Sequence, residues 1–205
     1  MKRTGFSVFH VRSARYGTTF VVSKAAHMDL IARADTSPEL VSYEVGAPRF
    51  DYIFEGAERT TTVPLSGRRK DGKQVFWDVA QERYSKEAAH ALAVRRKHAE
   101  LCGAEYVLFQ QVLGDNFAEV KNRKSAQLML FQAFNLDTEQ VETKALLELQ
   151  AGAKAVSDLA ATLKVPVSVM TVASLRLWLK GRAQLPFTTQ LLQPSWQVNR
   201  SAAHA

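Results

Sequence analysis

The spacing of apolar and polar residues in the first quarter of the chain alternates between strand and helix patterns. β-Branched and aromatic residues over 6–22 predict one or two strands, and apolar residues at helical spacing predict a helix over about 24–34. The segments 40–45 and 49–54 alternate as strands do, with a break between them, and are predicted to pair with each other. This part of the chain is therefore predicted to mix strands and helices.

The middle of the chain gives clearer signals. A Thr- and Val-rich run over 59–64 and an apolar strand over 74–79 flank the basic segment 66–72, which predicts a hairpin with 66–72 as its turn. An apolar period typical of a helix follows over 85–102, and then a short apolar strand over 106–110. Strand, helix and strand in this order predict a βαβ unit with parallel pairing.

The chain after residue 120 is predicted to be mainly helical. Ser157 and Ser168 are good N-cap residues for the last two helices, which are separated by a turn and form a helix-turn-helix pattern. The predicted elements are helices over 121–134, 138–149, 158–163 and 168–180, followed by extended pieces over 184–187 and 195–198. We therefore predict an α/β fold with two domains, a mixed sheet flanked by helices over 1–120 and a small winged-helix-like domain over 121–205.

Composition limits where the protein works. The 205 residues are 46% hydrophobic, which is enough for a buried core, yet charged residues interrupt every long apolar stretch. We expect a cytoplasmic protein with no secretory signal and no membrane span. Cys102 is the only cysteine, so an intrachain disulfide and a multi-cysteine zinc site are excluded. We interpret this residue as a buried structural thiol.

The charge favours a polyanionic partner. The formal net charge is +7, and residues 151–205 hold six basic side chains against one acidic side chain. Cations near DNA release condensed counterions and so add affinity that does not depend on base sequence. We therefore expect double-stranded DNA as the partner.

The helix predicted over 168–180 has the pattern of a DNA-recognition helix. Its apolar stripe can be buried on the preceding helix, which leaves short polar and basic side chains for the major groove or the phosphates. Trp178 and Trp196 are assigned to packing. The candidate DNA contacts are Ser168, Thr171, Ser174, Arg176 and Lys180 on the helix, with Lys164, Arg182 and Arg200 as phosphate contacts. The alternative is that these helices form a protein-interaction module with charges for solubility.

The order of elements resembles the TnsA-type transposon endonucleases, in which a restriction-endonuclease-like domain precedes a winged-helix tail. The resemblance covers about 21–109 for the first domain and 139–198 for the tail. It depends on the segment Thr62-Val63-Pro64-Leu65 and on the strand segment over 72–80. It implies an activity on DNA, with a transposase or an ATPase as a partner protein.

The residues at the family's catalytic positions depart from its pattern. The resemblance implies carboxylates that gather Mg²⁺ and a Lys that supports the attacking water. Leu65 stands where the metal-binding Asp is expected, Ala80 where the Lys is expected, and Ala26 or His27 where the first Glu is expected. Asp78 is the one plausible remaining ligand, so the aligned site is expected to hold no cofactor and to lack cleavage activity.

Two further hypotheses compete with a DNA-binding protein that does not cut. The first is an active, divergent endonuclease with a relocated Mg²⁺ site built from Asp51, Asp78 and Lys73. The second is a protein-interaction adaptor. In the leading hypothesis, basic residues of the helix over 85–102 bind phosphates beside the cleft; the alternative is that they form a solvated helix face, with positive charge favoured near the C-terminal end by the helix dipole. These basic residues are Lys86, His90, Arg95, Arg96, Lys97 and His98.

Overall fold

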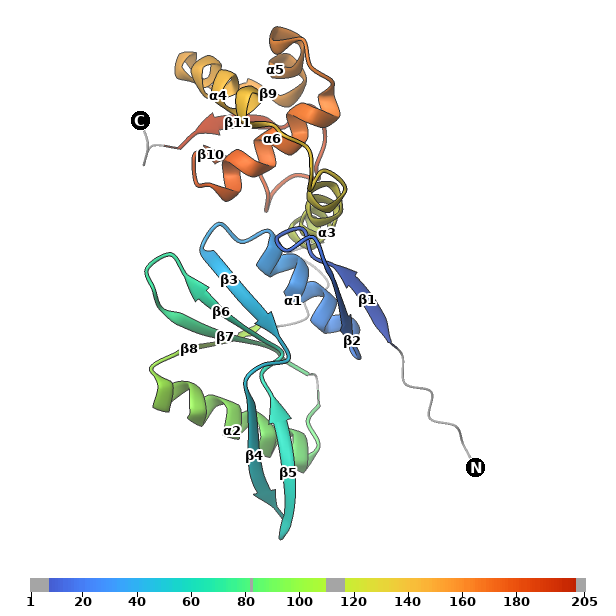
Figure 1. Ribbon diagram of the computed structural model, residues 1–205, viewed down its shortest axis with the longest axis vertical. Coiled ribbons are helices and arrows are strands. Elements are labelled where there is room, and N and C mark those ends of the chain that lie inside the picture. Colours follow the sequence, from blue (N-terminus) through green and yellow to red (C-terminus); the bar gives the residue numbers. More distant parts are fainter. Residues whose placement is uncertain (1–7, 82, 110–116, 202–205) are drawn as a thin grey trace. The chain divides into compact units, whose positions relative to one another are not determined.

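The computed structural model describes residues 8–81, 83–109 and 117–201 (Figure 1). The chain forms two compact units. Unit 1 comprises Met1–Val11, Thr19–Ala34 and Glu39–Val112, and unit 2 comprises Arg12–Thr18, Asp35–Pro38 and Leu113–Ala205. The chain is a mixed α/β protein, as expected, and each unit has its own buried apolar cluster.

Unit 1 is built on a four-stranded mixed sheet. The strand order is β3 (Leu40–Val45), β6 (Leu65–Arg69), β7 (Gln74–Val79) and β8 (Glu105–Phe109). The pairs β3–β6 and β6–β7 are antiparallel, whereas β7 and β8 are parallel. Helix α2 (Lys86–Cys102) connects the two parallel strands. The predicted βαβ unit is therefore confirmed.

A helix covers each face of this sheet (Figure 1). Successive side chains of a strand point to opposite faces. Val75 and Trp77 accordingly share a buried cluster with Leu30 and Ile31 of α1 (Ala25–Asp35). The intervening Phe76 packs with residues that include Ala99 of α2. Ser85 caps the start of α2 and Gly103 ends it in the left-handed conformation, as the helix pattern over 85–102 predicts.

Two hairpins complete unit 1, and one of them corrects the predicted pairing. Strands β1 (Phe9–Arg12) and β2 (Thr19–Val22) form a two-stranded sheet. The predicted strands over 40–45 and 49–54 exist, but they do not pair with each other. Strand β4 (Arg49–Phe54) pairs with β5 (Ala57–Thr62), while β3 pairs with β6.

The segment predicted as a basic turn is a central strand of the sheet. β6 lies between β3 and β7, and its first three residues are buried. The Gly67 position explains the error, because a Cβ atom there would lie 3.1 Å from the side chain of Leu40 and 3.1 Å from the carbonyl oxygen of Ser42. Glycine at this position permits close strand approach and does not mark a turn.

Unit 2 consists of helices around a small sheet. Its three strands are antiparallel, in the order β10, β11, β9. The axes of α5 and α6 meet at 115° across a short break. The elements in chain order are α3 (Phe117–Gln132), α4 (Glu139–Glu148), the 3-10 turn η1 (Leu149–Ala151), β9 (Lys154–Ala155), α5 (Val156–Leu163), α6 (Val167–Leu179), β10 (Ala183–Gln184) and β11 (Gln197–Arg200). The helices and the break predicted after residue 120 are present. The two extended pieces are displaced from their predicted ranges, since β10 shares only Gln184 with 184–187 and β11 shares only 197–198 with 195–198.

Helix α6 is the centre of the core of unit 2. Met170, Leu175 and Leu177 are fully buried, as is Trp196 from the segment before β11. Trp178 stacks on the ring of Phe187, with centroids 4.3 Å apart. Both tryptophans therefore pack as predicted.

Three local predictions are wrong. Ser157 and Ser168 lie inside the first turns of α5 and α6, because each helix begins one or two residues earlier, after Ala155 and Pro166 respectively. Cys102 is exposed, since it is the last residue of α2 and faces solvent there.

No single helix among the described residues is long and apolar enough to cross a membrane. The bent pair α5 and α6 reaches that apolarity only when both helices are taken together.

Candidate functional site

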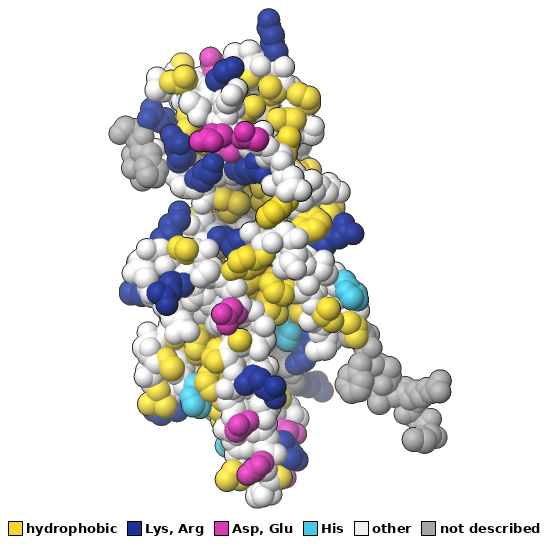
Figure 2. All heavy atoms as spheres, in the orientation of Figure 1, with side chains coloured by type: hydrophobic (Ala, Val, Ile, Leu, Met, Phe, Trp, Pro, Cys, Tyr) yellow, Lys and Arg dark blue, Asp and Glu magenta, His cyan; other side chains and the backbone are white. Residues whose placement is uncertain are grey.

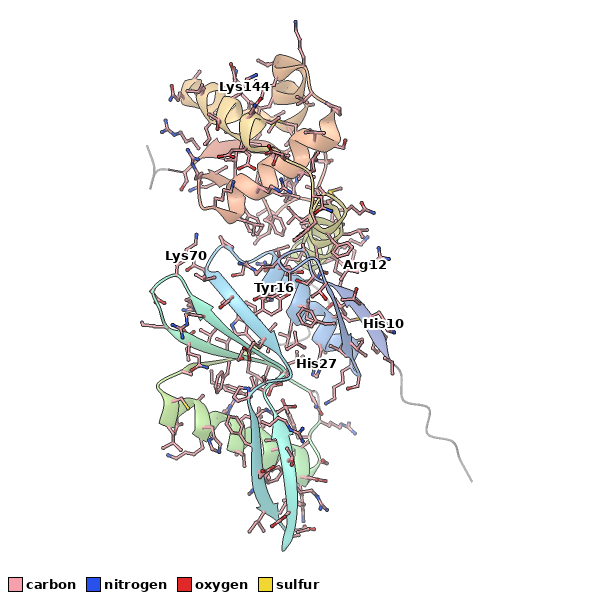
Figure 3. The ribbon with its side chains drawn as sticks, in the orientation of Figure 1. His10, Arg12, Tyr16, His27, Lys70 and Lys144 are labelled. Carbon is pink, nitrogen blue, oxygen red and sulfur yellow. The ribbon has the colours of Figure 1, made fainter. Side chains whose placement is uncertain are left out.

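A cavity of about 610 Å³ opens in unit 1 where the start of α1 meets the ends of β5 and β7. His27, which Figure 3 labels, lies in the first turn of α1. The residues that line the cavity are Ser23, Lys24, Ala26, His27, Thr60, Thr61, Thr62, Pro64, Asp78, Val79, Ala80, Gln81, Arg83 and Arg95. Among these described residues, the lining contains one carboxylate and three cations that are charged at neutral pH.

Asp78 is buried, and donors occupy both of its carboxylate oxygens. Oδ2 accepts from Nε of Arg95 at 2.8 Å and lies 2.6 Å from Nη2 of the same residue. The hydroxyl of Tyr106 donates to the same oxygen at 2.5 Å, and the backbone N–H of Val79 donates to Oδ1 at 2.8 Å. The Asp78 side chain therefore has a complete set of partners within unit 1.

Arg95, on α2, bonds both to Asp78 of β7 and to Thr61 of β5. Its Nη1 donates to Oγ1 of Thr61 at 2.6 Å, and its side chain is 13% exposed. Burial by itself lowers the pKa of Arg95, but the charge of Asp78 and the contacts with Tyr106 outweigh burial and raise this pKa above its ordinary value. Burial first, and then the hydrogen bond to Asp78, raise the pKa of the Tyr106 hydroxyl, which therefore stays protonated and donates.

Two basic side chains of the cavity remain open to solvent. Lys24 precedes α1 and Arg83 precedes α2, and both are exposed. Neither forms an ion pair with any residue that the structure describes. Burial and then the charge of Lys24 lower the pKa of His27, so this imidazole is neutral near neutral pH. The open charge of the cavity is therefore positive.

The structure brings together the positions at which the sequence resemblance places catalytic groups. Ala26, His27, Asp78 and Ala80 all line this cavity. Leu65 occupies the position at which the resemblance places the metal-binding Asp. It is fully buried at the start of β6, immediately after the lining residue Pro64.

The donor set of this cavity does not fit a divalent metal ion. Within residues 8–81, 83–109 and 117–201, no three His, Cys, Asp or Glu side chains gather as metal ligands. Asp78 already accepts from the Arg95 guanidinium, whose fixed positive charge would repel a second cation at the same oxygen.

The relocated catalytic site considered from the sequence does not assemble around Asp78. Lys73 precedes β7 and Asp78 lies near its end, so five residues of extended strand separate them, which is roughly 16 Å. Lys73 lies 3.9 Å from Asp71 in the exposed turn. Asp51 accepts a hydrogen bond from Thr60 across the β4–β5 hairpin.

The basic residues of α2 do not form one stripe. Only Arg95 lines the cavity. Arg96 lies over the Tyr106 ring, 5.7 Å from its centroid, and Lys97 is exposed beside Glu100. His98 stacks on Phe50 and His90 packs near Tyr52 and Phe54. On the face shown in Figure 2, the basic side chains are likewise scattered among other surface types.

The polar residues of the predicted recognition helix differ in their exposure. Ser174 is 1% exposed and its hydroxyl donates to the carbonyl of Met170, so the prediction that it faces outward is wrong. The hydroxyl of Thr171 donates to the carbonyl of Val167 in the same way. Ser168 is exposed in the first turn, and Lys164 is exposed in the preceding turn.

Arg176 and Lys180 have partners inside unit 2. Arg176 donates to the carbonyl oxygens of Ala133 and Leu136 and to the hydroxyl of Thr138, at 2.5 to 2.7 Å. These bonds satisfy carbonyls just beyond the end of α3. Lys180 binds Glu142 at 2.6 Å. Arg182, beyond the end of α6, is exposed.

Sequence reasoning missed two charged residues of the cavity, Lys24 and Arg83, and one partner of Asp78, Tyr106. None of the three carries a motif, because each lies at the edge of a predicted element. The pairing of β7 with β8 provides the one usable signal: it places Phe76 opposite Tyr106, two residues from Asp78. A parallel βαβ unit therefore predicts that Tyr106 lies near Asp78 once the register is known.

No family model matches the chain, and no curated protein gives a significant match.

Proposed function

We propose that this chain is a DNA-binding component of a mobile-element DNA-processing system, and that it holds duplex DNA without cutting it. Cutting and joining would then belong to a partner protein, a transposase or an ATPase-controlled enzyme. The proposal follows from the arrangement of unit 1, the charge of its cavity and the order of elements in unit 2.

The arrangement of unit 1 supports the likeness to restriction endonucleases. Apart from the β4–β5 hairpin inserted between β3 and β6, helix α1, strands β3, β6 and β7, helix α2 and strand β8 have the order of a restriction-endonuclease-like core. The cavity lies at the start of β6 and the end of β7, where such a fold would carry its catalytic groups. Unit 1 therefore supplies a cleft of the kind that accepts a DNA backbone.

The observation that carries the proposal is the charge of this cavity. Lys24 and Arg83 are exposed at its rim, while Asp78, the one carboxylate that the described residues contribute to the lining, is neutralised by Arg95. Among the described lining residues, a phosphodiester would meet two open cations and no open anion, which favours binding. The same pairing removes the carboxylate that hydrolysis would need for its metal ion.

Unit 2 supports a DNA-binding role by its topology. Helix α4, β9, α5, α6, β10 and β11 follow the order of a winged helix, with β11 between the other two strands. The angle of 115° between α5 and α6 suits a helix-turn-helix pair. Because Ser174 is buried and the side chains of Thr171 and Arg176 are bonded within unit 2, contacts to phosphates are expected to outweigh base reading.

A salt titration tests the proposal. Fluorescence anisotropy with a short labelled duplex should show binding that weakens as the salt concentration rises, with a log–log slope of about −0.9 for each phosphate neutralised. The variants Lys24→Ala and Arg83→Ala should each make this slope shallower by about 1.

Lys73→Ala is the matched control, because Lys73 is an exposed lysine at the opposite end of β7. It should leave the slope within error of the unaltered protein. Supercoiled plasmid incubated with Mg²⁺ or Mn²⁺ should stay intact. Nicking that Asp78→Ala abolishes would establish an active endonuclease, and absence of duplex binding at low salt would favour a protein-interaction adaptor.

A further inference from the structure

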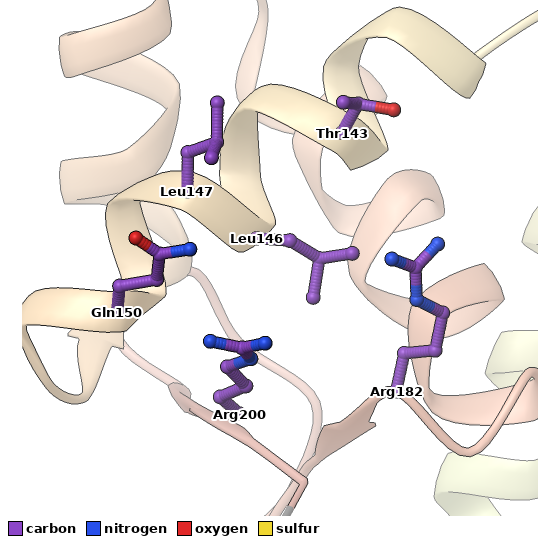
Figure 4. A pocket seen from close by; sticks show the side chains of 6 residues that line it. All are labelled: Thr143, Leu146, Leu147, Gln150, Arg182 and Arg200. Atoms are coloured by element: carbon purple, nitrogen blue, oxygen red, sulfur yellow. The ribbon is translucent and has the colours of Figure 1, made fainter. Parts of the chain in front are cut away.

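The cavity of unit 1 differs in size and charge from two cavities of unit 2. One of these, of about 140 Å³, lies between α4 and the β10–β11 strands (Figure 4), and at about 30 Å³ for each water molecule it has room for roughly five of them. The other, of about 680 Å³, is lined by the exposed carboxylates of Asp137 and Glu139, which would repel a polyanion. The cavity of unit 1 combines a volume of about 610 Å³ with two open cations.

Charge is distributed unevenly between the rim and the interior of the unit 1 cavity. The open cations, Lys24 and Arg83, are exposed at the rim. In the interior, the charges of Asp78 and Arg95 cancel because the two side chains pair with each other. Burial lowers the pKa of His27, so this imidazole is neutral near neutral pH. Among the described lining residues, the interior therefore offers a ligand no net charge, while the rim offers two positive charges.

Short and uncharged side chains make up much of the interior wall. Ala26 lies in the first turn of α1 and Ala80 directly follows β7, and no described lining residue has a smaller side chain. Pro64 and Val79 add apolar surface. The neutral imidazole of His27 adds one hydrogen-bond donor and one acceptor. The interior therefore suits an uncharged group that has apolar faces and polar edges.

A single nucleotide matches this cavity in size and in charge. Cavities of about 300–1,000 Å³ enclose ligands of drug size, and one nucleotide belongs to that class. Its phosphate is an anion, which suits the rim, and its base is uncharged at neutral pH, with hydrogen-bonding edges and a face that stacks. A base inside an intact duplex enters such a cavity only at the cost of unpairing and unstacking. An unpaired nucleotide avoids most of that cost.

We propose that the cavity of unit 1 binds one unpaired nucleotide of DNA, with its phosphate at Lys24 and Arg83 and its base beside Ala26 and Ala80. This inference rests on the proposed function, which supplies DNA as the ligand. It narrows that ligand from duplex DNA in general to a duplex that carries an unpaired nucleotide. Such a nucleotide occurs at the end of a strand or at an unpaired position within the duplex. The two sources share one chemistry, and the experiment distinguishes them.

The first measurement uses the unaltered full chain and four labelled duplexes with the same core sequence. One duplex is blunt, two have a one-nucleotide overhang on the 5′ or the 3′ strand, and one has a single unpaired nucleotide at its centre. Fluorescence anisotropy should show that at least one duplex with an unpaired nucleotide binds about 10-fold more tightly than the blunt duplex, because no base pair has to open. Tighter binding of an overhang identifies a strand end, and tighter binding of the third kind identifies an internal position.

Two variants then fill the cavity without changing its charge. Ala26→Leu adds bulk from α1, and Ala80→Leu adds it from the segment after β7. In each variant the preferred duplex and the blunt duplex should bind within about 2-fold of each other, because the base no longer fits. Ala93→Leu makes the same change at an exposed position of α2 outside the lining, and it should keep the full preference. Circular dichroism and melting temperatures show which variants fold, and either filling variant alone suffices for the test.

The outcomes separate this inference from the proposed function. Equal binding of all four duplexes by the unaltered protein would overturn the inference and leave the proposed function standing. A preference that a folded filling variant retains would place the unpaired nucleotide outside the cavity and overturn the inference as well. Absence of binding to every duplex at low salt would defeat the proposed function and the inference together. A preference that the filling variants lose and Ala93→Leu keeps would support both.

Discussion

The two units each contain an ion pair with a buried carboxylate, and the pairs differ in what happens to the cation. Asp78 of unit 1 is 7% exposed and its partner Arg95 is 13% exposed. Glu142 of unit 2 is 5% exposed, yet its partner Lys180 is 53% exposed. Burial of the acid alone therefore does not decide whether the base stays available to a ligand.

The difference follows from the geometry of the two cations. The guanidinium of Arg95 has enough donors to bond both Asp78 and Thr61, so it is held from two strands and is enclosed. The ammonium of Lys180 reaches Glu142 on a flexible stem, while Thr138 satisfies the other oxygen of that acid. The pair in unit 1 is structural, whereas the pair in unit 2 leaves an ammonium partly open to solvent.

The strongest test of this contrast is to remove the enclosed cation. Arg95→Met should lower the free energy of unfolding by about 3–5 kcal/mol, because it leaves the Asp78 carboxylate buried without a counter-charge. Urea unfolding followed by circular dichroism measures this loss. The double variant Asp78→Asn, Arg95→Met has neither charge and should be more stable than Arg95→Met alone.

A loss below about 1 kcal/mol for Arg95→Met would contradict the contrast, because this is the range of an exposed pair. The variant Asp78→Asn tests the same contrast by removing the acid in place of the base. This variant frees the positive charge of Arg95 inside the cavity, so duplex affinity should rise even though stability falls.

The next test uses pH and concerns His27, which lies in the same cavity as the enclosed pair. Burial and Lys24 lower its pKa below the ordinary value of 6.5. As the pH falls below 6.5, the unfolded chain therefore takes up this proton before the folded protein does. Above about pH 6.5, His27 does not affect the free energy of unfolding. As the pH falls below 6.5, the contribution of His27 lowers the free energy of unfolding.

Melting temperatures at about pH 7.5 and about pH 5.5 measure this effect. The decrease on acidification should be smaller in His27→Gln than in the unaltered protein. An equal decrease in both proteins would show that other groups account for the pH dependence and that the cavity does not disfavour a charged imidazole.

The fold was predictable where a local signal was strong. Ser85 and Gly103 mark the ends of α2 by capping, and the apolar strands on either side of it predict the parallel pair β7–β8. The pairing of β3 with β6 was not predictable, because 66–72 has the composition of a turn. Only the close contact of Gly67 with Leu40 and Ser42, made across the sheet, explains a strand there.

The position of the candidate site could be predicted from the sequence, but the side-chain contacts within it could not. The segment before Leu65 and the strand that ends near Asp78 located the cavity. The partners of Asp78 could not be predicted, because Arg95 and Tyr106 come from α2 and β8 and meet it only in the folded sheet. On α6, the helical period alone could not show that Ser174 is buried and bonded to its own helix, or that Arg176 bonds to the segment just after α3.

The smallest expected effect comes from the open pair of unit 2. Lys180→Met should lower the free energy of unfolding by about 1 kcal/mol or less, because the ammonium is half exposed and Glu142 keeps its bond from Thr138. The loss should shrink further in about 1 M salt, where exposed charges are screened within about 3 Å. Urea unfolding at low and high salt measures both values, with Lys97→Met as the control for an exposed lysine pair on α2. A loss for Lys180→Met as large as that for Arg95→Met would mean that the burial of the carboxylate governs the energy of both pairs, and that the exposure of the cation does not.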